Sequence, residues 1–379
     1  MTMLKDRAQK ASVLRLCLSK RWLPQLEVEV EPARSIDRNR TLLTDVDVLA
    51  VAPTAIGGHG RIAFDCKSGL NESAMAQAFW LHGVMARLSI SHGFVVLSDK
   101  VAIERDHRMS AADLGVSLLH EGELQSLAKG LGGSVAAGGG ATESIDAWDR
   151  YFEIGAKYPK LSEYTRFARS SYWMIRDPGE QARKMVMRLR AIRGELDPVK
   201  PEHLAIFGDA LCLFLLTLAE LGTRLFLLLL QSASREEFSA AVMSLLYGGT
   251  DNVETAQKLR KLAGGADADA AQSIFPEIDK FEHLVRELLE APRQALTAAM
   301  LARELGFSFL MGSGENRYQQ ELQMEAPYAS KFILVASEYL RRAARLPPEF
   351  ASLFSDRALN LQIVAMVGEG QGAASSGAR

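Results

Sequence analysis

Cysteine is scarce in this sequence and follows no pattern. The three cysteines, Cys17, Cys66 and Cys212, lie far apart and form no CxxC pair. This spacing argues against a structural zinc site and a disulfide framework, and it indicates a reducing compartment. The first residues, MTMLKD, also lack the apolar core of a signal peptide. We therefore expect a cytoplasmic protein.

An excess of charge of one sign is also lacking. The 44 lysine and arginine residues are balanced by 46 aspartates and glutamates, which leaves a formal net charge of −2. No global positive field is available to attract nucleic acid, so such contacts would have to come from local clusters. With 379 residues, 48% of them hydrophobic, the chain is long enough for two or three domains with complete cores.

A single long apolar run extends from Leu204 to Leu230. Its length is sufficient to span a bilayer, which is one interpretation. However, Asp209, Glu220 and Arg224 interrupt the run, and the last two are spaced to pair on a helix. We therefore expect no membrane partner, and instead a helix buried in a helical bundle or against a second subunit.

The most informative feature is the triplet Asp65-Cys66-Lys67, with a second acid, Asp47, 18 positions upstream. Both acids lie in strand-like runs, residues 45–51 and 61–67, in which polar and apolar residues alternate. Side chains two apart on a strand share a face, so Asp65 and Lys67 project together, and Asp47 joins them if the strands pair. The GGHG sequence at 57–60 is expected to be the hairpin between them.

The triplet alone is weak, because composition gives roughly two acid-x-lysine triplets by chance. A solvated rim with an ordinary ion pair is the plain alternative. The order of elements around the triplet favours a site. The sequence predicts a helix over 4–22, a strand over 26–31, the two acid-bearing strands, a helix over 71–90, a strand over 93–98 and a closing segment over 111–127.

In this arrangement, residues 1 to about 130 resemble the restriction-endonuclease-like PD-(D/E)xK nucleases, particularly the Mrr-type and Holliday-junction-resolvase-like branch. The likeness is carried by the element order and by three motifs, TDVDVL at 44–49, FDCKSG at 64–69 and AADLGV at 111–116. It implies an α/β domain with a mixed sheet flanked by helices. It also implies Asp47, Asp65 and the backbone carbonyl of Cys66 as ligands of Mg²⁺ or Mn²⁺, with Lys67 as the catalytic lysine.

The first helix departs from the family pattern, because many relatives carry a glutamate there and residues 4–22 contain none. Glu27, Glu29 or Glu31 on the next strand can substitute, or the site does without one. We take Glu29 as the auxiliary candidate.

Two further choices remain. Gln77 lies on the helix where some relatives have a glutamine, and it is a second auxiliary candidate. Asp45 shares a face with Asp47, and we prefer Asp47 because the apolar run follows it directly.

The expected chemistry follows from these groups. Mg²⁺ prefers oxygen ligands, commonly one or two carboxylates with waters and substrate phosphate. The ion would activate a water and neutralise charge on the scissile phosphate. Lys67 would orient that water or stabilise negative charge developing on phosphorus.

Basic residues cluster on two predicted helices, over 4–22 and 180–193. For each cluster alone, a solvated helix face is at least as good an interpretation. Together with a nuclease-like domain they favour contacts to DNA phosphates. The residues expected to make these contacts are Lys5, Lys10, Lys20, Arg21, Arg183, Lys184 and Arg188.

Composition predicts the domain organisation. The glycine-rich stretch at 131–144 is expected to be a linker between the nuclease-like domain and an all-α domain over 145–367. Residues 368–379 are rich in glycine, alanine and serine, which predicts a disordered tail.

We expect a metal-dependent nuclease that hydrolyses phosphodiester bonds. The resemblance implies a DNA endonuclease acting in restriction, defence or repair. The helical domain would recognise DNA, regulate cleavage, or form a homo-oligomer or a complex with a partner. The alternative is a catalytically inactive nuclease fold that serves as an adaptor through its helical domain, binding protein or nucleic acid.

Overall fold

The computed structural model of the chain describes residues 4–32, 41–55, 57–230, 234–262 and 277–376. They form two compact units. The first unit comprises residues 1–54, 59–153 and 166–174, and the second comprises residues 55–58, 154–165 and 175–379. The predicted boundary at 131–144 differs from this division, because residues 145–153 and 166–174 belong to the first unit.

Ion pairs explain why the chain after the glycine-rich stretch still belongs to the first unit. Arg7 lies 2.6 Å from Asp146 and also contacts Asp149, which joins helix α5 (Ile145–Lys157) to the N-terminal helix. The glycine-rich stretch itself lies against that helix, with the Ser134 backbone N–H donating to the Ser19 hydroxyl over 2.9 Å.

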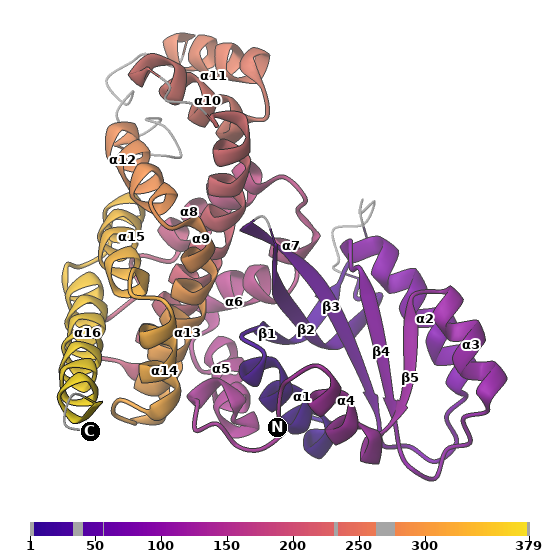
Figure 1. The fold of residues 1–379 in the computed structure, drawn as a ribbon. Helices are drawn as coiled ribbons and strands as arrows, with labels where there is room; N and C mark the ends of the chain where they lie inside the picture. Colours follow the sequence, from indigo (N-terminus) through magenta and orange to yellow (C-terminus); the bar gives the residue numbers. More distant parts are fainter. Residues whose placement is uncertain (1–3, 33–40, 56, 231–233, 263–276, 377–379) are drawn as a thin grey trace. The chain divides into compact units, whose positions relative to one another are not determined.

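The first unit is built on a five-stranded sheet with strand order β1-β2-β3-β4-β5 (Figure 1). The strands are β1 (Leu23–Val30), β2 (Thr44–Thr54), β3 (Gly57–Lys67), β4 (His92–Leu97) and β5 (Val116–His120). β1 and β2 are antiparallel, whereas β3, β4 and β5 are parallel. β3 begins three residues after β2 ends, a connection short enough only for an antiparallel pair. The hairpin predicted between the two acid-bearing strands is therefore present, but the GGHG residues at 57–60 begin β3 and do not form the loop.

Helices flank this mixed sheet. They include α1 (Arg7–Ser19), α2 (Ala74–Leu88), α3 (Arg105–Asp113), α4 (Leu124–Gly130) and the short α7 (Ser171–Met174), with 3-10 turns at Glu121–Glu123 and Ala141–Glu143. α1 packs on β1 and β2, and α2 packs on β4 and β5. The sequence analysis missed α3, because that helix is largely polar and buries only Ala111. The α/β class predicted for the N-terminal region is confirmed.

α2 and β4 approach each other closely. A Cβ atom added at Gly93 would lie 2.7 Å from side-chain atoms of both Leu81 and Met85. Only glycine permits this distance, so Gly93 sets how deeply α2 sits on the sheet.

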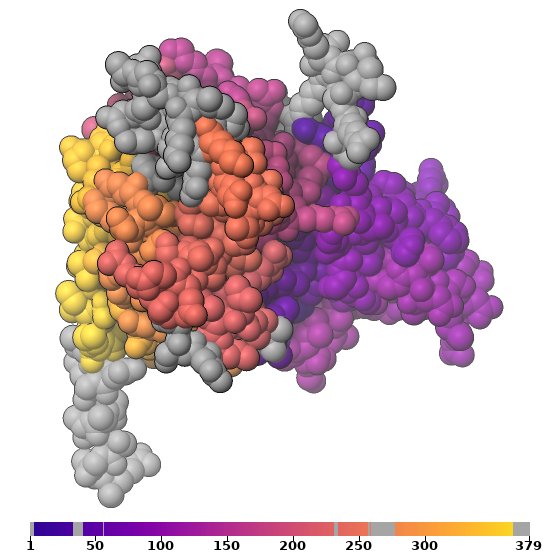
Figure 2. All heavy atoms as spheres, turned by 90° about the horizontal axis from the view of Figure 1, so that it is seen from above, coloured from indigo at the N-terminus to yellow at the C-terminus, as the bar shows by residue number. Residues whose placement is uncertain are grey.

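From residue 175 onward, the described part of the second unit is mostly helical, which confirms the predicted helical C-terminal region. The helices of this unit include the start of α6 (Ser162–Arg169), α8 (Pro178–Ala191), α9 (Pro201–Leu228), α10 (Arg235–Tyr247), α11 (Thr250–Leu262), α12 (Ile278–Leu289), α13 (Ala295–Met311), α14 (Arg317–Glu325), α15 (Ala329–Ala344) and α16 (Glu349–Ser376). Residues of α10 and α11, red in Figure 2, and of α16, yellow, form part of its surface. α16 continues through residues 368–376, where a disordered tail was predicted.

α9 is the core helix of this unit. Among the described helices it alone has the length and apolarity to cross a membrane, and 94% of its most apolar stretch is buried inside the protein. α13 packs along it, and a Cβ on Gly208 would lie only 2.7 Å from the Cα of Gly306. At this crossing Arg303 lies 2.7 Å from Asp209, and both side chains are fully buried.

Candidate active site

The two acid-bearing strands bring Asp47, Asp65 and Lys67 together on one face of the sheet. The Lys67 Nζ lies 2.6 Å from Asp65 Oδ1 and 3.5 Å from Asp47 Oδ2. Period-two alternation places Asp65 and Lys67 on the same side of β3, and pairing with β2 adds Asp47. A single ammonium group therefore reaches both carboxylates.

Cys66, between Asp65 and Lys67 in the chain, contributes backbone groups to the same site. The Cys66 backbone N–H donates to Asp47 Oδ2 over 2.6 Å, and the Cys66 carbonyl lies 3.5 Å from Lys67 Nζ. The Cys66 side chain is fully buried, and burial raises the pKa of its thiol well above the ordinary value. Cys66 thus contributes backbone groups to the site and an inert thiol to the core.

Asp65 is in an unfavourable environment for a carboxylate. Its side chain is only 1% exposed, and burial raises its pKa to about 7, with Lys67 opposing the rise and the neighbouring Asp47 carboxylate adding to it. Asp65 Oδ2 has no hydrogen-bond partner among the described residues. An unsatisfied buried oxygen of this kind costs about 1–3 kcal/mol, and more when it is charged.

Asp47 is held in the charged form by a residue that the sequence analysis assigned elsewhere. Lys10 Nζ lies 2.8 Å from Asp47 Oδ1 and also contacts Glu27 Oε1. Burial alone would raise the pKa of Asp47, but Lys10 and Lys67 lower it below the ordinary value.

Lys10 therefore does not serve as the predicted phosphate contact, because its side chain is only 2% exposed. The sequence does contain a signal for this. Lys10 shares the helical spacing i, i+3, i+4 and i+7 with Val13, Leu14 and Cys17, which are all fully buried. A lysine within an apolar stripe indicates a buried ion pair rather than a solvated cation.

Glu27, rather than the predicted auxiliary Glu29, reaches this cluster. Glu27 has a φ of 53° in the middle of β1, although the pairing is regular on both sides of it, with Leu26 opposite Val48. The left-handed conformation costs a non-glycine residue about 1–2 kcal/mol. In this conformation the Glu27 carboxylate contacts Lys10. Glu29 instead lies 3.4 Å from Arg169.

Arg169 continues the ionic contacts beyond Glu27. Its Nε donates to the Glu27 carbonyl over 2.8 Å, and its Nη2 lies 3.7 Å from Glu27 Oε2. The result is a line of alternating charges, which we call the charge row. The charge row consists of Asp65, Lys67, Asp47, Lys10, Glu27, Arg169 and Glu29.

The charge row ends at Asp65, whose cationic neighbour among the described residues is Lys67. The oxygen without a hydrogen-bond partner lies on this same residue.

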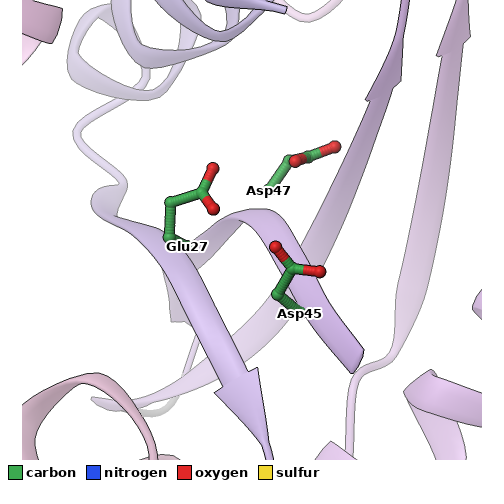
Figure 3. Close-up of side chains that lie close together, drawn as sticks. All are labelled: Glu27, Asp45 and Asp47. Atoms are coloured by element: carbon green, nitrogen blue, oxygen red, sulfur yellow. The ribbon is translucent and has the colours of Figure 1, made fainter. Parts of the chain in front are cut away.

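A third acid lies beside Asp47 and Glu27. Figure 3 shows Asp45 with these two residues, and oxygen atoms of all three lie within 4.8 Å of one another. Asp45 is exposed, so water screens its charge more than that of the two buried acids.

Gln77, the second auxiliary candidate, donates its side-chain amide to Glu72 over 2.8 Å, and Glu72 is not one of the acids of the candidate site. A glutamine on α1 is closer. The buried Gln9 lies with its Nε2 3.4 Å from the Lys67 carbonyl and 3.2 Å from Glu121 Oε2. The sequence analysis did not identify Gln9, because the distance from Gln9 to Lys67 depends on how α1 docks on the sheet.

The remaining basic residues have mixed environments. Lys5 is exposed, Lys20 donates to the Leu131 carbonyl, and Arg21 donates to the Leu18 carbonyl. Arg183, Lys184 and Arg188 belong to the second unit. There Arg183 lies over the Tyr247 ring, and the other two pair with Glu180 and Glu163.

The donor set at Asp65 suits a hard divalent cation. Asp65 Oδ2, Asp47 and the Cys66 carbonyl are all oxygen ligands, the type that Mg²⁺ and Mn²⁺ prefer. A cation at Asp65 Oδ2 would satisfy the buried oxygen. The residues present therefore fit the ion that the sequence analysis expected.

Comparisons with protein-family models, curated proteins and solved structures found no match to this chain.

Proposed function

We propose that this protein is a metal-dependent nuclease of the restriction-endonuclease-like PD-(D/E)xK type, and that its substrate is DNA. The observation that carries the proposal is the buried Asp65 oxygen without a partner, beside Lys67 and Asp47. Burial lets this carboxyl keep a proton up to about pH 7 in the metal-free protein, and a divalent ion would take the place of that proton.

A positively charged site suits a phosphodiester. A divalent ion beside Asp65 would add to the positive charge of Lys67, and the negative charge of a phosphodiester would compensate it. Buried sites favour such compensation, because uncompensated charge is costly in a low dielectric.

The residues of the site would have two different roles, metal binding and stabilisation of charge on the phosphate. Asp65, Asp47 and the Cys66 carbonyl would hold the ion, which supplies Lewis acidity and a bound water of lowered pKa. Burial alone would lower the pKa of Lys67, but Asp65 and Asp47 raise it above the ordinary value. Lys67 therefore stays cationic and would stabilise negative charge on the phosphate rather than accept a proton.

The test measures cleavage of supercoiled, linear duplex and single-stranded DNA, and of RNA, in Mg²⁺ and in EDTA. We expect cleavage by the wild type in Mg²⁺ only, none by Asp65→Ala, and at least about 100-fold less by Lys67→Ala. Asp106→Asn alters an exposed acid on α3 and should cleave as wild type. If Asp65→Ala cleaves as fast as wild type, the site assignment is wrong.

One observation favours the alternative of an inactive fold acting as an adaptor. Both Asp47 oxygens already accept from protein donors, Oδ1 from Lys10 and Oδ2 from Cys66 and Lys67. This leaves Asp47 fewer free lone pairs for an ion than Asp65 has. Absence of cleavage of every nucleic acid form by the wild-type protein, in Mg²⁺ and in Mn²⁺, would support the adaptor.

A further inference from the structure

Three carboxylates crowd together at the edge of the candidate site. Glu27 on β1 and Asp45 and Asp47 on β2 offer oxygen atoms within 4.8 Å of one another (Figure 3). Two of the three residues are buried. Charges this close in a partly buried place repel strongly, so the group requires a cation.

Lys10 supplies this cation from inside the protein. Its ammonium group lies 2.8 Å from Asp47 Oδ1 and also contacts Glu27 Oε1. The helix holds it there, because Val13 and Leu14, one turn further along α1, are fully buried in the core. The ammonium position is therefore set by helix packing rather than by solution conditions.

We propose that Lys10 is a fixed internal cation that takes the place of a divalent ion between Glu27, Asp45 and Asp47. The protein then admits one divalent ion, at Asp65, and not two. The number of ions bound by the wild type rests on the proposed function, whereas the effect of replacing Lys10 does not.

This arrangement makes Lys10 a positioning residue. By binding Asp47 Oδ1 it leaves Asp47 Oδ2 directed at the Cys66 N–H and Lys67. An ammonium group carries one charge and no activated water, whereas a divalent ion carries two charges and brings its own waters. Lys10 would thus stabilise the acids without adding a second reactive centre.

The test counts bound Mn²⁺ by titration calorimetry and by electron paramagnetic resonance, without nucleic acid. Lys10→Gln removes the cation and leaves the three carboxylates facing one another. We expect this variant to bind one more Mn²⁺ than the wild type. Equal numbers of ions in the two proteins would overturn the proposal.

Lys10→Gln also removes the nearest cation from two buried carboxylates, which leaves Asp47 with Lys67 at 3.5 Å and Glu27 with Arg169 at 3.7 Å. We therefore expect the variant to be destabilised in EDTA and to regain stability in Mn²⁺. A variant that stays unfolded in saturating Mn²⁺ contradicts the proposal. A second variant, Lys10→Met combined with Glu27→Gln, removes one cation and one carboxylate together. It should fold in EDTA and bind the extra ion at least tenfold more weakly, and unchanged binding would exclude Glu27 as a ligand.

Asp65→Asn separates this inference from the proposed function. We expect one ion in the wild type, none in Asp65→Asn, two in Lys10→Gln and one in the combined variant. If Asp65→Asn binds Mn²⁺ as the wild type does, the proposed catalytic ion is misplaced. The gain caused by Lys10→Gln still tests the role of Lys10 in that case.

Discussion

At the scale of single residues, Asp65 combines three properties that rarely occur together by accident. It is buried, it keeps one oxygen unpartnered, and it lies beside a second carboxylate and an ammonium group. Groups with strongly perturbed pKa values and specific charged neighbours are concentrated at functional sites.

The titration of Asp65 leads to a prediction about stability. Burial raises its pKa from 3.8 to about 7, so the folded, metal-free protein retains a proton that the unfolded chain loses near pH 4. The contribution of this group to stability is therefore present below about pH 4 and is lost as the pH rises to about 7. We expect Asp65→Asn to reduce this loss, measured by urea unfolding at several pH values in EDTA.

Adding Mg²⁺ to the wild type should restore stability at the upper end of that pH range, because the ion replaces the proton on Asp65. A wild-type protein whose unfolding midpoint is the same in Mg²⁺ and EDTA near pH 7.5 would contradict the expected ion site.

At the scale of helices and strands, the site depends on how closely neighbouring elements approach. β1 provides Glu27 through a left-handed residue, and α1 delivers Lys10 to the same carboxylates. In the other half of the sheet, Gly93 allows α2 to lie directly on β4. In each case a residue that is unusual for its position, a left-handed glutamate, a buried lysine or a glycine in a strand, permits a specific tertiary contact.

The helix–strand contact at Gly93 can be tested with a matched pair of substitutions. Gly93→Ala would place Cβ 2.7 Å from Leu81 and Met85 atoms, so we expect a loss of about 1–3 kcal/mol in the free energy of unfolding. Gly83 lies on the exposed face of α2, and no described atom beyond its own stretch of helix backbone lies within 4 Å of a Cβ added there. Gly83→Ala should stabilise the protein by about 0.5–1 kcal/mol. Urea unfolding measures both, and equal effects would exclude close packing at Gly93.

At the scale of the whole molecule, each unit encloses an internal ion pair or network of its own. The first has the charge row, and the second has Arg303 and Asp209 at the crossing of α9 and α13. Tyr164 from α6 adds a hydroxyl donor to Asp209 over 3.3 Å.

The buried pair in the second unit should respond asymmetrically to substitution. Arg303→Met leaves Asp209 buried without its cation, and we expect a loss of about 3–5 kcal/mol in unfolding free energy. Combining it with Asp209→Leu removes both charges and should recover most of that loss. Thermal unfolding of the two variants provides the measurement. A double variant as unstable as the single one would mean that packing, and not charge, dominates at this position.

The extent of the first unit can be tested by truncation. A fragment of residues 1–174 retains α5 and Arg169, whereas a fragment of residues 1–144 loses both. Without Arg169 the buried Glu27 carboxylate keeps only Lys10 as a cationic partner among the described residues of this unit. We therefore expect cooperative thermal unfolding of the longer fragment and a markedly lower midpoint, or none, for the shorter one.

The sequence by itself determined the features that depend on local periodicity. Alternation along two short strands was sufficient to place Asp65 and Lys67 on one face, and turn and helix signals distinguished the sheet-containing region from the helical one. These patterns repeat every two or about 3.6 residues, so the direction of one side chain can be inferred from its neighbours in the sequence.

Only the tertiary structure decided which charged residues are buried together. Glu27 looks like an ordinary surface residue in the sequence, and Glu29 looked like the better auxiliary acid. The apolar stripe around Lys10 indicates burial, but it does not say which acids lie beside the ammonium group. Whether a charged side chain points to water or to an opposite charge depends on the elements that pack around it. The energy of such a pair comes from residues distant in the chain, Arg169 among them, and local sequence patterns carry no record of that contact.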